Sequence, residues 1–134
     1  MYKRQLEKTS DLHVVETRPL IPPSRLHNDI PLDYTSASTV SETRRSIKSI
    51  LHNNDKKLLV IVGPCSIHDV DAAKEYSNYI QNFREIYKDK LEIIMRVYFE
   101  KPRTTIGWKG LINDPHLDNS YDINTGLRLS LIHI

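Results

Sequence analysis

Hydrophobic residues form two short continuous runs, with a longer periodic stretch between them. Residues 58–62 read Leu-Leu-Val-Ile-Val and stop at Gly63-Pro64. An apolar run of this length without polar alternation is typical of a strand covered on both faces, as in a parallel sheet. Residues 91–98 form a second apolar run, interrupted by Arg96. We therefore expect two strands of a parallel sheet.

Residues 70–88 lie between the two runs and have helical periodicity. Their apolar positions recur at steps of three and four residues, which predicts one buried helix face. Asp69 is well placed to cap the N-terminus of this helix. The polar stretch 99–120 follows the second strand, and a further helix is predicted to begin near Asp122. This order of elements predicts a parallel α/β fold. The predicted core stripe consists of Ala73, Tyr76, Tyr79, Ile80, Phe83, Ile86 and Tyr87.

The N-terminal region has a different pattern. Residues 1–37 contain four prolines and no sustained periodicity, which predicts an extended arm with room for one short element. Thr39 and Glu42 have the spacing of a capping box, so we predict a helix from there to residues 53–55. Its apolar face is expected to comprise Val40, Ile47, Ile50 and Leu51.

Composition narrows the classes of protein without naming a function. The chain has 134 residues and a formal net charge of +2, which argues against nucleic acid or an anionic membrane as partner. No apolar run approaches the length of a membrane span, and residues 1–12 lack the apolar core of a signal peptide. The single cysteine excludes an intramolecular disulfide and fits a reducing compartment. We expect a cytoplasmic protein.

Gly63-Pro64-Cys65-Ser66-Ile67-His68 follows the first predicted strand. Ligands of parallel α/β folds bind at the carboxyl ends of the strands. A Cys65 thiolate there could ligate a divalent metal, with His68 as a second ligand or a hydrogen-bond donor. A buried structural cysteine is the competing interpretation, because free cysteine is among the most buried residue types.

Residues 96–105 follow the second strand and should lie at the same edge. Arg96, Lys101 and Arg103 place three cations within eight residues, and Thr104 and Thr105 add hydroxyl groups. Such groups commonly hold phosphate or carboxylate. A solvated run of charges is the alternative, although Arg96 in an apolar strand would be costly to bury without a partner.

Residues 107–116 have the composition of turns. Asp114 and His116 lie here, and we assign neither a role. A nucleotide-binding domain is disfavoured, because neither the dinucleotide-binding glycine motif nor the P-loop motif occurs in the sequence. The residues alone thus indicate an α/β enzyme that handles phosphate or carboxylate, with metal dependence left open.

Three strings of residues carry a resemblance to a known family. Residues 59–68 (LVIVGPCSIH), 95–105 (MRVYFEKPRTT) and 107–116 (GWKGLINDPH) resemble the short microbial class I type of 3-deoxy-D-arabino-heptulosonate 7-phosphate (DAHP) synthase. The match runs from about Val40 to Arg128. The family fold is a (β/α)₈ TIM barrel with an N-terminal extension. The resemblance implies an arm at residues 1–37 and, at residues 38–128, the first two βα units of such a barrel.

The resemblance also implies a reaction and residue roles. The family is a transferase of the shikimate and chorismate pathway, in which phosphoenolpyruvate adds to erythrose 4-phosphate and phosphate leaves. Cys65 would ligate a divalent metal of the Mn, Fe, Co or Zn type, which polarises the aldehyde. Arg96 and Lys101 would bind phosphoenolpyruvate and act in catalysis, while Arg103 and Thr104 would bind erythrose 4-phosphate. A homo-oligomer is expected for the full-length protein.

The chain departs from the family in length. A barrel needs about 250 residues, and the family's other metal ligands, a His, a Glu and an Asp, lie on later strands. We expect these 134 residues alone to be inactive and unstable. An inactive interaction module is the alternative function. Residues 129–134 (LSLIHI) match the translation of a transposase end used as a sequencing adapter, and we expect them to be adapter-encoded.

Overall fold

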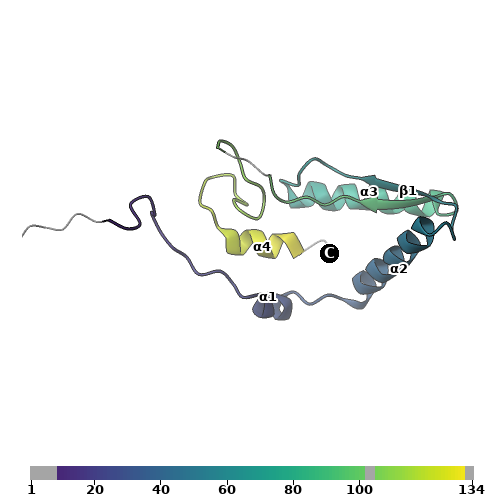
Figure 1. The fold of residues 1–134 in the computed structure, drawn as a ribbon, viewed down its shortest axis with the longest axis horizontal. Helices are drawn as coiled ribbons and strands as arrows, with labels where there is room; N and C mark the ends of the chain where they lie inside the picture. The colour runs from purple at the N-terminus through teal and green to yellow at the C-terminus, as the bar shows by residue number, and fades with distance from the viewer. Residues whose placement is uncertain (1–8, 102–104, 132–134) are drawn as a thin grey trace, which may run out of the picture.

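A computed structural model describes residues 9–101 and 105–131 of the chain. Figure 1 shows an extended N-terminal arm, a long helix that diverges from the sheet, and a short C-terminal helix near the arm. Along the chain, the described elements are α1 (Pro23–Asp29), α2 (Tyr34–Leu51), β1 (Leu58–Val62), α3 (Val70–Tyr87), β2 (Leu91–Met95) and α4 (Ile123–Leu131).

The two strands form a parallel sheet, as predicted. Leu58 pairs with Leu91 and Val62 pairs with Met95, so the strands end together. The second strand ends at Met95, before the predicted end at Tyr98. Arg96 N–H still donates to the carbonyl of Val62 at 2.8 Å. The ladder stops there because Pro64, next but one on the facing strand, has no N–H to donate.

The prediction that β1 is covered on both faces is wrong for this chain. Leu58 is 65% exposed and Ile61 is 63% exposed. Of the described residues, only β2 pairs with β1, and α3 packs mainly against β2. The apolar run is a sound indicator of a strand, but the surface that would cover β1 does not come from the described part of the chain.

Helix α3 begins where the sequence predicts. The Asp69 carboxylate accepts a hydrogen bond from the backbone N–H of Ala72 at 2.9 Å. This bond lowers the pKa of Asp69, because it stabilises the ionised carboxylate. The predicted core stripe is only partly buried: Ala73 and Ile80 are buried. Tyr76 is half-buried, and Tyr79, Phe83, Ile86 and Tyr87 are exposed.

Helix α2 begins at Tyr34, inside the region predicted to be arm. Asp33 caps it by accepting a hydrogen bond from the N–H of Ser36 at 2.7 Å. The predicted capping box at Thr39 and Glu42 is therefore wrong. The Thr39 hydroxyl instead donates to the carbonyl of Thr35 at 3.0 Å, within a helix that has already formed. The helix end is close to the prediction.

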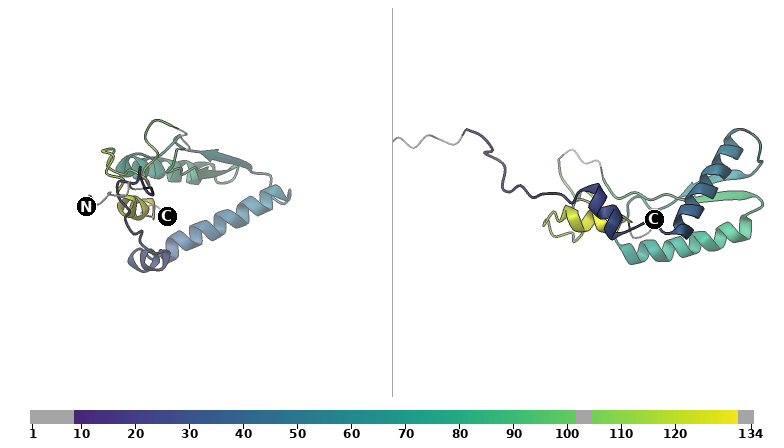
Figure 2. Two further views of the ribbon diagram at one scale, coloured as in Figure 1. Left: turned by 60° about the vertical axis from the view of Figure 1, so that its left-hand side comes forward. Right: turned by 90° about the horizontal axis from the view of Figure 1, so that it is seen from below.

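The arm contains the short helix α1, which lies beside α4 in both views of Figure 2. Arg128 of α4 forms an ion pair with Asp29 at the end of α1, with 2.7 Å between nitrogen and oxygen. Helix α4 begins after Asp122, near the predicted position. The Thr125 hydroxyl donates to the Asp122 carboxylate at 2.6 Å and lowers the pKa of Asp122.

The best-buried apolar cluster lies beyond the carboxyl ends of the strands. Ile67, Ala73 and Leu111 form it, with exposed fractions of 2%, 6% and 1%. At the other end of the sheet, Glu92 of β2 accepts hydrogen bonds from Ser46 of α2 and Arg84 of α3.

In the described ranges, no helix combines the length and apolar character that crossing a membrane requires.

Candidate active site

Two loops meet at the carboxyl ends of β1 and β2, and we call them together the rim: residues 63–69 and residues 96–101. The N–H of Ile67 donates to the carbonyl of Tyr98 at 2.8 Å, which joins the loops. Gly63 lies directly against the backbone of Arg96, and a Cβ atom at this position would collide with the Arg96 carbonyl oxygen. The absence of a side chain at Gly63 therefore allows the loops to approach.

Cys65 lies on the rim with its side chain accessible. The residue is exposed, so the interpretation of a buried structural cysteine is wrong. The ammonium group of Lys101 donates to the Cys65 sulfur, with 2.7 Å between Nζ and Sγ. An accessible sulfur beside a cation can act as a metal ligand or as a nucleophile, and both roles depend on the thiolate form.

The Arg96 guanidinium is held on the rim. One terminal nitrogen donates to the carbonyl of Pro64 at 2.7 Å and to that of Cys65 at 3.3 Å. The guanidinium carbon also lies 4.8 Å from the centre of the Tyr98 ring, within cation–π range. Arg96 is thus exposed but oriented, which distinguishes it from a solvated charge.

The loop at residues 109–110 supports the backbone of Lys101 through hydrogen bonds. The N–H of Lys101 donates to the carbonyl of Lys109 at 2.9 Å, and Glu100 forms an isolated antiparallel bridge with Gly110. Gly110 has φ +115°, a conformation that L side chains rarely adopt. Leu111 follows in the core, so the backbone of Lys101 is tied to the best-packed part of the molecule.

Three predicted site residues, Cys65, Arg96 and Lys101, are brought together by this arrangement. Arg103 and Thr104 lie outside the described residues. His68 is exposed on the rim, and its proposed role stays a prediction. Between residues 9 and 131, apart from 102–104, no group of three His, Cys, Asp or Glu side chains could hold a metal ion. Cys65 accordingly offers one accessible ligand atom.

Two residues near the rim have contacts that the sequence analysis did not identify. Asp114, given no role there, is only 4% exposed, and its carbonyl accepts a hydrogen bond from the Trp108 indole at 2.8 Å. The second residue is Tyr98, whose ring supports Arg96 from the same loop. Arg96 and Tyr98 are two residues apart, which places both side chains on one face of an extended segment. This spacing is the signal in the sequence that could have predicted their contact.

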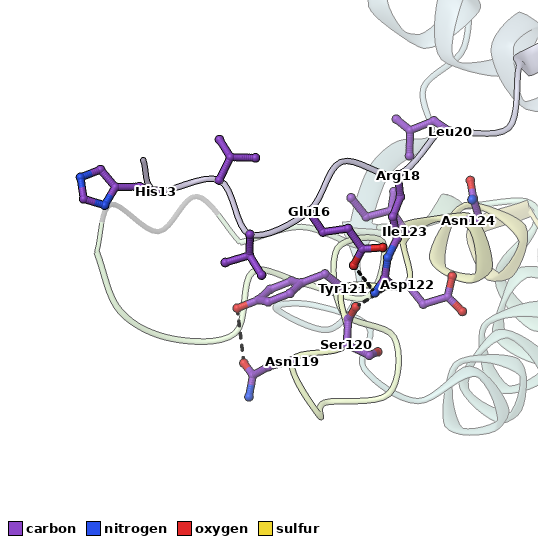
Figure 3. Close-up of a pocket in the computed structure, with 12 residues that line it drawn as sticks. His13, Glu16, Arg18, Leu20, Asn119, Ser120, Tyr121, Asp122, Ile123 and Asn124 are labelled. Carbon is purple, nitrogen blue, oxygen red and sulfur yellow. Dashed lines mark hydrogen bonds and ion pairs between the residues drawn. The ribbon is translucent and has the colours of Figure 1, made fainter. Parts of the chain in front are cut away.

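An open cleft of about 580 Å³ lies elsewhere, between the arm and the segment that leads into α4. Figure 3 shows Arg18 and Glu16 of the arm on one side and Tyr121 and Asp122 on the other. Arg18 donates to the Ser120 carbonyl at 3.4 Å across it. The cleft is lined by residues 13–16, 18, 20 and 119–124, so it does not include Cys65, Arg96 or Lys101.

Comparison of the sequence with models of known protein families identifies the family of this chain. The model of the DAHP synthetase I family matches residues 30–133, most of the chain. The chain belongs to the DAHP synthetase I family. This match includes both strands, the rim and α4. The family predicted by resemblance is therefore confirmed.

Individual relatives of this DAHP synthetase I segment agree. The Phe-sensitive phospho-2-dehydro-3-deoxyheptonate aldolase of Escherichia coli K12 is 55% identical over 123 residues, 92% of this chain and 35% of that protein. A relative from Haemophilus influenzae is 47% identical over 133 residues, 97% of this chain and 37% of its own length. The chain thus spans about a third of the length of these relatives.

A solved structure shows the same backbone arrangement. The phospho-2-dehydro-3-deoxyheptonate aldolase of Francisella tularensis SCHU S4 superposes with a TM-score of 0.83 at 55% identity. The superposition covers 87% of this chain and 34% of that one. The mixed α/β fold with a small parallel sheet is therefore that of a DAHP synthetase I segment.

Proposed function

We propose that the polypeptide containing this segment is a 3-deoxy-7-phosphoheptulonate synthase. It condenses phosphoenolpyruvate with erythrose 4-phosphate and water to give DAHP and inorganic phosphate, the first step of the shikimate pathway to aromatic amino acids. Family membership and the names of the relatives support this proposal. The observation that carries it is the grouping of Cys65, Arg96 and Lys101 on one rim.

The proposed substrates are both phosphorylated anions, which fits the charge of the rim. Arg96 and Lys101 bind phosphoenolpyruvate, and their fixed cations stabilise charge on its phosphate and carboxylate as the reaction proceeds. Carbonyl groups and the Tyr98 ring already orient the guanidinium of Arg96, so little ordering is needed when the anion arrives. Arg103 and Thr104 bind erythrose 4-phosphate, an assignment supported by the resemblance alone.

A divalent metal ion is part of the proposal, with Cys65 as one of its ligands. The exposed thiol at the rim fits this role, because an accessible sulfur can ligate Zn, Fe, Co or Mn as thiolate. When bound, the ion would supply Lewis-acid polarisation of a carbonyl group. The ammonium nitrogen of Lys101 lies 2.7 Å from the sulfur and keeps a cation beside it.

We infer that β1, α3, β2 and α4 are the first two units of a (β/α)₈ barrel. The exposed apolar surface of β1 supports this, because the outer helices and the packed interior of a barrel would cover its faces. A cytoplasmic location and a homo-oligomer of the full-length protein also remain proposals. The 134 residues alone are proposed to be inactive, since one accessible ligand atom does not define a metal site.

Substitution of Cys65 tests the proposal directly. In the full-length enzyme, Cys65→Ser should reduce metal-dependent phosphate release by at least about a hundredfold, because a metal ligand is lost. Bound metal, measured by elemental analysis, should fall in parallel, while the thermal unfolding midpoint of the apoprotein stays unchanged. Unchanged activity and metal content would exclude Cys65 as a ligand.

Another observation separates the alternative function, an interaction module. The exposed apolar side chains of β1 and α3 favour this alternative, since such surfaces often bind a partner. The alternative concerns the 134 residues acting alone as an inactive module. The genomic DNA past codon 128 separates the two hypotheses: a reading frame that continues into a barrel supports the synthase, and a true stop codon supports the module.

A further inference from the structure

Asn124 connects two regions of the chain that are far apart in sequence. Its side-chain oxygen accepts a hydrogen bond from the N–H of Ile21 at 2.9 Å. Its side-chain nitrogen donates to the carbonyl of Pro19 at 3.2 Å. One amide thus uses both of its polar atoms on the backbone of the arm, on either side of Leu20. This geometry fixes the position of the arm along α4.

The arm also contacts this region at two further points. Arg128, one helical turn after Asn124, forms the ion pair with Asp29 described above. Arg18 donates to the Ser120 carbonyl, just before α4. Figure 3 shows Asn124 on the side of α4 where the arm passes, with Leu20 nearby. Residues four apart share one helix face, so Asn124 and Arg128 together form an arm-facing surface.

The opposite side of α4 faces the loop behind the rim. Gly126 is buried, and at 100° per residue it lies on the other face from Asn124. Gly126 lies against the backbone of Ile112, where a Cβ atom would collide with the Ile112 carbonyl oxygen. Helix α4 is therefore held between the arm and this loop.

The loop that α4 contacts in turn holds Lys101. Ile112 follows Leu111, whose neighbours Lys109 and Gly110 bond to residues 101 and 100. Interiors packed at this density transmit displacements, because there is little free space to absorb them. A shift of α4 is expected to move the backbone that supports Lys101.

We propose that Asn124 is a positioning residue: by fastening the arm to α4, it sets the position of Lys101 on the rim. The catalytic part of this inference rests on the proposed function, in which Lys101 binds phosphoenolpyruvate. The structural part does not, because the arm, α4 and the loop are connected whatever reaction occurs. Asn124 itself touches neither Cys65 nor the rim cations.

Hydrogen exchange of the full-length enzyme tests the structural part at two amides. The N–H of Ile21 reports on the Asn124 bond, and the N–H of Lys101 reports on its bond to Lys109. Asn124→Ala should accelerate exchange at Ile21 roughly tenfold, the effect of losing one hydrogen bond. Exchange at Lys101 should accelerate about threefold, through local opening of the loop.

Two further variants control the experiment. Asn124→Asp retains an acceptor for the Ile21 N–H and should restore most of the protection. Asn78→Ala replaces an exposed asparagine of α3 and should change neither amide. Faster exchange at Ile21 with an unchanged rate at Lys101 would overturn the coupling. Unchanged exchange at both amides would overturn the fastening itself.

Steady-state kinetics test the catalytic part. In Asn124→Ala, the KM for phosphoenolpyruvate should rise about threefold while kcat stays within about twofold of the wild type, as expected when binding is weakened uniformly. A fall in kcat with unchanged KM would contradict a role through Lys101. If the wild type shows no turnover, the proposed function fails, yet the exchange experiment still decides whether the arm and the rim are coupled.

Discussion

The rim and the faces of the sheet differ in how completely this chain packs them. Beside the rim, Leu111 is 1% exposed and Ile67 is 2% exposed, both covered by neighbouring loops. On β1, Leu58 and Ile61 remain more than half exposed. The apolar residues that support the candidate site thus find their contacts within the chain, whereas the sheet requires additional surface. The segment therefore supplies more of the contacts that hold the rim in place than of those that cover the faces of its sheet.

Substituting one residue from each region tests this difference most strongly. In the full-length enzyme, Leu111→Ala should lower the free energy of unfolding by about 2–5 kcal/mol, through lost burial and a cavity. Ile61→Ala should cost a similar amount only if further strands cover β1. Chemical denaturation measures both values. A loss below about 0.5 kcal/mol for Ile61→Ala, as for a surface residue, would contradict a barrel around β1.

Gly63→Ala probes how closely the two rim loops approach. The added Cβ atom would collide with the backbone of Arg96, which cannot move as a flexible side chain does. The expected cost is about 1–3 kcal/mol of stability, as for overpacking of a well-packed site. Thermal unfolding and phosphate release should both decline. Wild-type stability would show that the loops are free to separate.

The cationic side chains of this region are proposed to bind different substrates, and substitutions can test this assignment. Lys101→Ala should raise the KM for phosphoenolpyruvate about tenfold or more, with a smaller effect on erythrose 4-phosphate, and Arg103→Ala should show the reverse. Lys90→Ala, an exposed lysine at the opposite end of the sheet, is the matched control. Equal effects of each variant on both substrates would reject this division.

Asp69 provides the smallest expected effect, at the start of α3. Its pKa is lowered in the folded state by the Ala72 N–H. The stabilisation is therefore present above the pKa of the unfolded chain and is lost as pH falls through the lower, folded-state pKa. Asp69→Ala should slightly lower the urea midpoint of the full-length enzyme at neutral pH, with the difference from wild type vanishing in acid. Asn78→Ala, which removes a side chain without a titratable group from an exposed position of α3, should show no such pH dependence.

Local patterns predicted much of the fold. The run at 58–62 gave the limits of β1, and Asp69 gave the start of α3. Because parallel strands end at one edge, the sequence also predicted that Cys65 and Arg96 would be neighbours. The predicted start of α2 was wrong because Asp33 caps the helix at an earlier position, and aspartate is a stronger N-cap than the threonine at position 39.

Contacts between distant segments were beyond prediction. The side chain of Asn124 forms hydrogen bonds with the backbone of Ile21 and Pro19, which precede it by 103 and 105 positions. No periodicity or motif in the sequence marks such a pair. The apolar run at β1 likewise predicts a covered strand but not the segment that covers it. The side chain of Lys101 was placed near Cys65 only by the folded loop.

The parallel pairing of Leu58 with Leu91 has a consequence for synthesis on the ribosome. β1 has no strand partner until α3 and β2 have also emerged, after which the rim contacts at residues 65–111 can form. At about 5–20 residues per second, the nascent chain then waits many seconds for the rest of the proposed barrel of about 250 residues. During this interval the open edge of β1 can pair with another chain. A chaperone that binds extended apolar segments is therefore expected to engage residues 58–62 first.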